Sequence, residues 1–235
     1  RKRKGGAMDD VAGTKELDYA SDLQLIKSMH EDDSFWDRIF DAKLDFLNNG
    51  GDPRQAGCVR PEIAESWINS RNFGLNPDQP DLGEYITEQA YEETLAENAE
   101  IVAAAKSLIR NIESLNLQND YMFELLDVNG TPLVQIGDLW LHRFAGPNYQ
   151  CNESNMGTNA HTLCMPFVLI GPEHYCFALH GLIACAAPII DQFGASVGAL
   201  ALTQPTSDEL LSTANKKILI HAMSLVSSLA ITLSD

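Results

Sequence analysis

The hydrophobic periodicity of this 235-residue chain changes near residue 120, and that change constrains the fold more than any other feature. Before it, apolar residues recur at helical spacing over 87–116, which predicts one long helix. After it, residues 121–128 and 131–137 alternate as strands around Asn129-Gly130, a strong signal for a β-hairpin. A helix followed by consecutive antiparallel strands indicates an α+β fold rather than a strictly alternating parallel sheet.

Further elements on both sides of the hairpin complete the predicted layout. Helices are expected at 9–31, 33–49, 60–74, 153–164 and 210–233, and a loop anchored by Trp140 is expected at 138–150. Strands are expected at 167–170, 180–190 and 195–203, and the last two form a second predicted hairpin. Ser34 is predicted to cap the second of these helices, and Pro61 suits the first turn of the third. The sequence therefore predicts an antiparallel sheet flanked by long N- and C-terminal helices and preceded by a small helical segment.

This layout divides the chain into three parts. Residues 1–8 contain the run Arg1–Lys4 and are interpreted as a remnant of expression cloning, with a nucleic-acid-binding arm as the alternative. Residues 9–82 form the helical N-terminal segment, and residues 83–235 form the sheet domain.

The charge of the chain limits its partners. It carries 33 acidic and 16 basic residues, a formal net charge of −17. Such a surface repels phosphate backbones, so direct contact with nucleic acid is not expected. No apolar run approaches the roughly 18–20 residues of a membrane span, and no signal peptide is visible, so we expect a cytoplasmic protein without a membrane partner.

The five cysteines are odd in number and irregular in spacing, which indicates reduced thiols rather than a disulfide framework. Histidines and cysteines also gather between residues 161 and 185. Their spacing does not match a standard zinc or iron site, so neither a metal nor another cofactor is expected. No cysteine has a base and an oxyanion donor in a recognisable pattern, so catalysis is not predicted.

Two blocks of sequence carry a resemblance to a known family. The first block contains Val59-Arg60-Pro61-Glu62-Ile63, Ser66-Trp67 and Gly74-Leu75-Asn76-Pro77. The second contains Asn129-Gly130, Asn152-Glu153, Gly157-Thr158-Asn159-Ala160, Glu173-His174-Tyr175 and Cys185-Ala186-Ala187-Pro188-Ile189. Together they resemble the N-terminal GAF sensor domain of sigma-54-dependent transcription activators of the acetoin-catabolism-regulator type. The chain departs from the family pattern at Asn69, where an arginine is usual, and at His161-Thr162, where Gly-Thr is usual.

The resemblance implies a regulatory domain with a GAF-like sheet, which binds a small-molecule effector. Full regulators of this type also carry an AAA+ ATPase and a helix-turn-helix DNA-binding domain. This chain has neither a Gly-x-x-x-x-Gly-Lys-Ser/Thr phosphate loop nor a recognisable DNA-reading helix. We therefore expect a sensor that forms a homodimer through helices 87–116 and 210–233 and passes its ligand state through them.

Polar residues of the second block are the candidate ligand contacts. They are Asn152, Glu153, Thr158, Asn159, Thr162, His174, Tyr175 and Cys185. For the first five, helix capping and loop hydrogen bonds are the structural alternative. For His174 and Tyr175, the alternative is a local network that holds their loop together with Glu173. The small side chains of residues 184–188 leave space for a ligand over the sheet, or for close approach of a covering helix.

Two other functions remain open at the level of sequence. One is a redox or sulfoxide-reducing enzyme with a GAF fold, which would need an exposed thiol of low pKa. The other is a dimerisation or protein-docking module without a ligand, which would have a filled core beneath residues 184–188.

Overall fold

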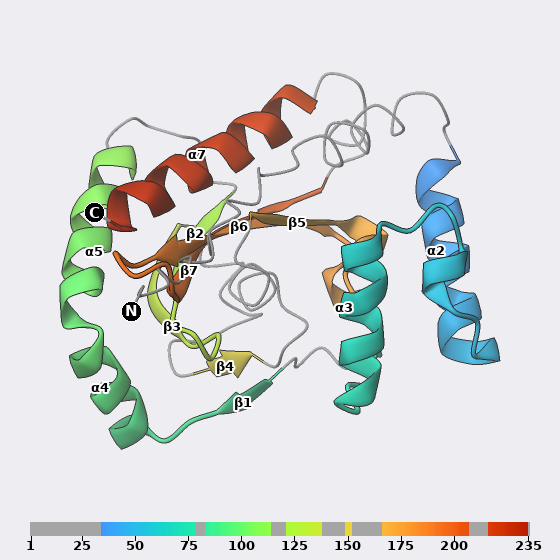
Figure 1. The fold of residues 1–235 in the computed structure, drawn as a ribbon, viewed down its shortest axis with the longest axis horizontal. Helices are drawn as coiled ribbons and strands as arrows, with labels where there is room; N and C mark the ends of the chain where they lie inside the picture. The colour runs from blue at the N-terminus through green and yellow to red at the C-terminus, as the bar shows by residue number, and fades with distance from the viewer. Residues whose placement is uncertain are drawn as a thin grey trace, which may run out of the picture.

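Five antiparallel strands form the central sheet of the protein, in the order β3-β2-β7-β6-β5 (Figure 1). The computed structural model describes residues 34–78, 83–113, 121–137, 149–151, 166–206 and 216–234. The strands are β2 (Met122–Leu126), β3 (Pro132–Gly137), β5 (Phe167–Ile170), β6 (Leu182–Ile190) and β7 (Ser196–Pro205). The predicted α+β class and all the strands predicted from periodicity are confirmed.

Short turns built on aspartate close both predicted hairpins. In the β2–β3 turn, the Oδ1 atom of Asp127 accepts hydrogen bonds from the backbone N–H groups of Asn129 and Thr131, at 2.9 and 2.7 Å. Gly130 follows with φ 77°, a left-handed conformation that favours glycine. Asp191 plays the same part in the β6–β7 turn, where its Oδ1 atom accepts two backbone bonds of 2.8 Å.

The prediction of one long helix over 87–116 is wrong in one respect, because this segment forms two helices. These are α4 (Glu88–Glu97) and α5 (Ala99–Glu113), separated by Asn98. The Asn98 side-chain amide donates to the carbonyl of Thr94 at 2.8 Å. Asparagine competes for helix backbone groups in this way, and the apolar stripe continues across the break, so periodicity could not reveal it.

The other long helix and the N-terminal helices agree with the sequence. They are α7 (Lys216–Ser234), α2 (Phe35–Asn49) and α3 (Pro61–Asn72). Gly50 ends α2 with φ 75°, and Pro61 opens α3 at its first position. Ser34 stands at the start of α2, but its side chain makes no capping hydrogen bond, so that part of the prediction is wrong.

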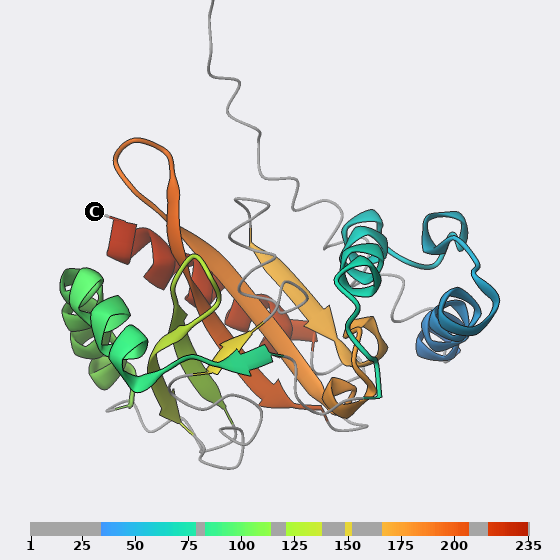
Figure 2. The same ribbon diagram turned by 90° about the horizontal axis from the view of Figure 1, so that it is seen from below.

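The helices and a small ribbon surround the sheet. Helix α7 lies on one side, and the antiparallel pair β1 (Gly83–Tyr85) and β4 (Tyr149–Cys151) lies on the other (Figure 1). Helices α4 and α5 lie at the β3 edge, whereas α2 and α3 lie beyond the β5 edge (Figure 2). Three-residue strands are too short to show a period, so β1 was not predicted, and the predicted loop in fact ends in β4.

The connection between β5 and β6 meets the N-terminal helices. It contains two 3₁₀ turns, η3 (Gly171–Glu173) and η4 (Phe177–Leu179), while a third, η1 (Pro53–Gln55), links α2 to α3. The predicted helices at 9–31 and 153–164 and the Trp140 anchor lie outside the described residues. No helix within the described ranges combines the length and apolarity that crossing a membrane requires.

Candidate functional site

A buried polar cluster joins α2 and α3 to the β5–β6 connection. Its members are Lys43, Arg60, Trp67, Glu173, His174 and His180. The bonds from Lys43, Arg60 and Trp67 reach partners more than 100 residues away along the chain, so the cluster is a tertiary contact rather than only a local loop network. Buried polar groups are costly unless they are paired, so these bonds help to hold α2 and α3 against the β5–β6 connection.

The centre of the cluster is a two-pronged ion pair between Arg60 and Glu173. Arg60 Nε donates to Glu173 Oε1 at 3.0 Å, and Nη2 donates to Oε2 at 2.9 Å. Arg60 also donates to the Val168 carbonyl at 2.7 Å, which ties it to strand β5. Glu173 is only 1% exposed. Burial raises the pKa of its carboxyl, and the guanidinium opposes that shift without cancelling it.

Trp67 adds a neutral hydrogen bond beside the ion pair. Its indole Nε1 donates to the backbone carbonyl of Glu173 at 2.7 Å, and its side chain is fully buried. The ring stacks on Phe46 of α2, with centroids 6.3 Å apart. Trp67 therefore links both N-terminal helices to the same residue of the β5–β6 connection.

A pair of tryptophans offers a matched test of this bond. Trp67→Phe is expected to destabilise the protein by about 1–3 kcal/mol, because the buried Glu173 carbonyl loses its donor. The indole N–H of Trp36 is also buried but has no hydrogen-bond partner among the described residues, so Trp36→Phe should cost clearly less. Urea unfolding of both variants measures the difference; equal losses would contradict a role for the Trp67 bond.

Lys43 brings a third type of interaction into the cluster. It is fully buried, donates to the His174 carbonyl and lies with its Nζ atom 3.0 Å from His180 Nε2. The same Nζ atom is 4.9 Å from the centroid of the Trp67 ring. Burial lowers the pKa of Lys43 to about 7, although Cys176 and Glu173 favour its charged form.

The two histidines of the cluster are also held neutral. Burial, reinforced by Lys43 and His180, lowers the pKa of His174 to about 3. Burial and Lys43 lower the pKa of His180 to about 4. All three bases of the cluster therefore favour their neutral forms, and acidification opposes docking.

The chain after α3 continues the contact along the β5–β6 connection. The Tyr175 hydroxyl donates to the Leu75 carbonyl at 3.2 Å, and the backbone N–H of Phe177 donates to the Pro77 carbonyl at 2.9 Å. Together with the ion pair, these bonds place the segment that contains Arg60, Trp67 and Leu75 directly against Glu173-His174-Tyr175.

The sequence-predicted ligand residues fall into two groups. Asn152, Glu153, Thr158, Asn159 and Thr162 lie outside the described residues, so their role stays a prediction. His174 and Tyr175 belong to the docking cluster, and Cys185 lies at the centre of β6, 1% exposed.

Sequence reasoning missed Lys43 and Arg60. Lys43 follows Ile39 by four residues and precedes Phe46 by three, so it stands within the apolar face of α2. A lysine inside an apolar stripe signals a buried partner, and this signal could have been used. Arg60 stands just before Pro61 and gave no sign of its distant carboxylate.

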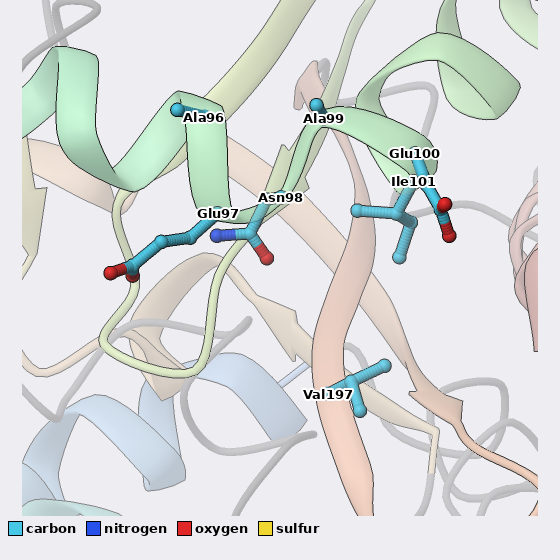
Figure 3. A pocket seen from close by; sticks show the side chains of 7 residues that line it. All are labelled: Ala96, Glu97, Asn98, Ala99, Glu100, Ile101 and Val197. Carbon is cyan, nitrogen blue, oxygen red and sulfur yellow. The ribbon is translucent and has the colours of Figure 1, made fainter.

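An open surface hollow lies at the junction of α4 and α5 (Figure 3). Residues 96–101 and Val197 line it. The Asn98 amide is bonded to the Thr94 carbonyl, so it is not free to orient a ligand there. Nor do the described residues contain a group of three histidine, cysteine or acidic side chains placed to hold a metal.

Comparison with known protein sequences gives one relative. No protein-family model matches the chain. An uncharacterised 47.3 kDa protein encoded in the thcA 5′ region of Rhodococcus erythropolis is 26% identical over 181 residues. The match covers 71% of this chain and 41% of the relative, so the chain spans about two fifths of that protein's length.

Comparison with solved structures shows which known folds this chain is similar to. The E. coli DhaR(N)–DhaL complex contains a chain that matches with a TM-score of 0.61 and 17% identity, over 74% of this chain and 62% of that one. The GAF domain of A. aeolicus nlh2 matches with a TM-score of 0.36 and 12% identity, over 73% of this chain and 96% of that one. The five-stranded antiparallel sheet with its flanking helices is a GAF-like α+β fold.

Proposed function

We propose that this chain is the small-molecule sensor of a sigma-54-dependent transcription regulator of the acetoin-catabolism-regulator type. The observation that carries the proposal is the Arg60–Glu173 ion pair, because it joins the two sequence blocks on which the resemblance depends. Residues of the two blocks form one buried unit, as expected if both belong to a single regulatory module. The GAF-like fold supports the same function.

The proposed effector site lies over the sheet and uses Asn152, Glu153, Thr158, Asn159 and Thr162. His174, Tyr175 and Cys185 would contribute from the sheet side. His174 and Tyr175 already join the β5–β6 connection to the N-terminal helices, so a ligand that moves this connection would also alter helix docking. This coupling gives the sensor a physical route from ligand to protein conformation.

The proposed output runs through the helices on the sheet. Helices α5 and α7 contact each other, and a homodimer built on them would report a shift in their packing. We propose that AAA+ and helix-turn-helix domains receive the signal in the full-length protein.

A protein-docking function is the second candidate. The matched E. coli structure is a complex of DhaR(N) with DhaL, so a chain of similar fold binds a protein. A redox enzyme fits less well at the two buried thiols, Cys176 and Cys185. Burial raises the pKa of Cys176 to about 11 and that of Cys185 to about 12, which disfavours their thiolate forms.

A thermal-shift screen of small metabolites tests the sensor function. A ligand at 100 times its Kd stabilises the folded state by about 2.7 kcal/mol. For a chain of this size, that energy raises Tm by about 5–10 °C. The absence of a Tm shift with any metabolite would contradict the sensor function and favour the docking function. A thiol titration with DTNB tests the redox enzyme, which would need a reactive cysteine.

A further inference from the structure

The hollow at the junction of α4 and α5 combines an apolar lining with an acidic edge. The apolar side chains that line it are Ala96, Ala99, Ile101 and Val197. The side chains of Glu97 and Glu100 extend to opposite sides of it (Figure 3). Its volume of about 490 Å³ lies within the range of about 300–1,000 Å³ that is usual for binding pockets. Because the hollow is open to solvent, it suits a side chain presented by another protein.

The apolar lining of the hollow is left uncovered by the described part of the chain. Ala96 and Ala99 are exposed, and Val197 is 37% exposed. Helix α4 has no buried residue, and the Tyr91 hydroxyl ties it to the sheet by donating to the Pro132 carbonyl at 2.9 Å. A helix this short is marginal without packing, so a protein segment seated in the hollow would stabilise α4.

The surface around the hollow is acidic and has no compensating base. Residues 88–105 include five glutamates, all of them exposed, and no lysine or arginine. No lysine or arginine of the described residues forms an ion pair with these glutamates. Glu93 and Glu97 lie four residues apart on α4, so their charges repel. Glu97 also lies at the C-terminal end of α4, where the helix dipole disfavours a negative charge.

We propose that this hollow is a docking site for a basic amphipathic segment of another protein. An apolar side chain of that segment enters the hollow, and its lysines or arginines lie against Glu97 and Glu100. Burial of the apolar side chain supplies affinity, and the opposite charges supply specificity and speed of association. The inference gives the protein-docking function a surface and a class of partner, and it does not depend on the sensor function.

A second copy of this chain is a poorer occupant than a basic protein. If the hollow met its counterpart across a two-fold axis, the glutamates of both copies would face one another. Like charges opposed across an interface are costly, and each copy already carries a net charge of −17. The acidic edge therefore favours a partner of opposite charge.

The test uses a labelled, helix-forming peptide of roughly 15 residues, with leucines along one face and lysines elsewhere. In one counterpart alanine replaces every leucine, which keeps the helix and the charge. In the other, glutamate replaces every lysine, which keeps the apolar face. Fluorescence anisotropy should show that the leucine–lysine peptide binds the wild-type protein at least about tenfold more tightly than either counterpart.

Charge reversal at the edge of the hollow tests the role of its glutamates. Glu97→Lys combined with Glu100→Lys should weaken binding of the leucine–lysine peptide by about tenfold or more, because two attractive charges become repulsive. The control combines Asp41→Lys and Glu65→Lys, which change the net charge equally at exposed positions of α2 and α3. These helices lie beyond the β5 edge, away from α4 (Figure 2), so the control should bind as the wild type does.

Filling the hollow tests its shape separately from its charge. Ala99→Trp puts a large side chain at an exposed position of the lining and should weaken binding by about tenfold or more. Ala104→Trp makes the same substitution at an exposed position of α5 outside the lining and should leave binding unchanged. Circular dichroism of each variant checks that the helices are retained.

Several results would overturn the proposal. Equal weakening by both charge-reversal pairs would mean that the peptide responds only to net charge. Unchanged binding to the Ala99→Trp variant, or tighter binding of the glutamate peptide, would contradict the apolar and acidic parts of the site in turn. Analytical ultracentrifugation tests the second copy as occupant: a wild-type dimer that Ala99→Trp converts to a monomer would make the hollow a self-interface.

Discussion

A Glu173→Gln variant is expected to lose about 3 kcal/mol of unfolding free energy, because the buried Arg60 guanidinium loses its two-pronged carboxylate partner and keeps the partly exposed Glu62 carboxylate, 3.1 Å away. The Arg60 side chain is only 9% exposed, so water cannot replace the carboxylate. Urea unfolding followed by tryptophan fluorescence measures the loss. Limited proteolysis should also cut the segment after α3 faster, since the ion pair fixes the N-terminal helices to the sheet.

Two controls define the origin of this loss. A double variant, Arg60→Met with Glu173→Gln, should recover part of the stability, because it removes the buried charge that has lost its Glu173 partner. Arg54→Gln breaks an ion pair with Asp52 on the exposed surface and should cause no measurable change. If Glu173→Gln were as harmless as Arg54→Gln, the docking role of the Arg60–Glu173 pair would be wrong.

A Lys43→Met variant is expected to be more stable than the wild type at pH 7, by up to about 4 kcal/mol. Lys43 has an ordinary pKa of 10.5 and a folded-state pKa of about 7. Between these values the unfolded chain binds the proton and the folded protein does not, so wild-type stability rises with pH. Methionine has no proton to bind, and its volume suits the same apolar surroundings. It cannot donate to the His174 carbonyl, so the loss of that bond offsets part of the gain.

The pH dependence separates this effect from simple repacking. The advantage of Lys43→Met should shrink by about 2 kcal/mol between pH 7 and pH 9, because the wild type loses about half of its penalty over that range. Lys106→Met, at an exposed position of α5, should keep the wild-type slope. An advantage that does not vary with pH would contradict the lowered pKa of Lys43. Below pH 6.5, His174 and His180 should make both proteins less stable.

The strands of the two hairpins and the pairing within each hairpin were predictable because local signals encode them, whereas the β2–β7 and β5–β6 pairings were not. Asn129-Gly130 and the strand pattern on both sides of it define the first hairpin. In the second hairpin, two strand segments are likewise separated by a short turn. The break at Asn98 was not predictable from periodicity, since one hydrogen bond from the Asn98 amide interrupts a continuous apolar stripe. Three-residue strands such as β1 lie below the length at which a period can be seen.

The docking cluster was predictable only in part. Glu173-His174-Tyr175 stood out in the sequence, and a loop network was one of the two interpretations considered. The partners of these residues could not be identified, because no local rule relates Arg60 to Glu173 across 113 residues. Tertiary ion pairs of this kind depend on which surfaces the complete fold brings together, and a single sequence does not contain that information in readable form.

The wide separation of Arg60 and Glu173 along the chain has a consequence for biosynthesis. A ribosome adds about 5–20 residues per second, so roughly 6–23 s pass between the synthesis of these two residues. During this interval Trp67 and Lys43 exist without the β5–β6 connection that later covers them. The nascent N-terminal helices are therefore exposed to chaperones and proteases until the second half of the chain is made.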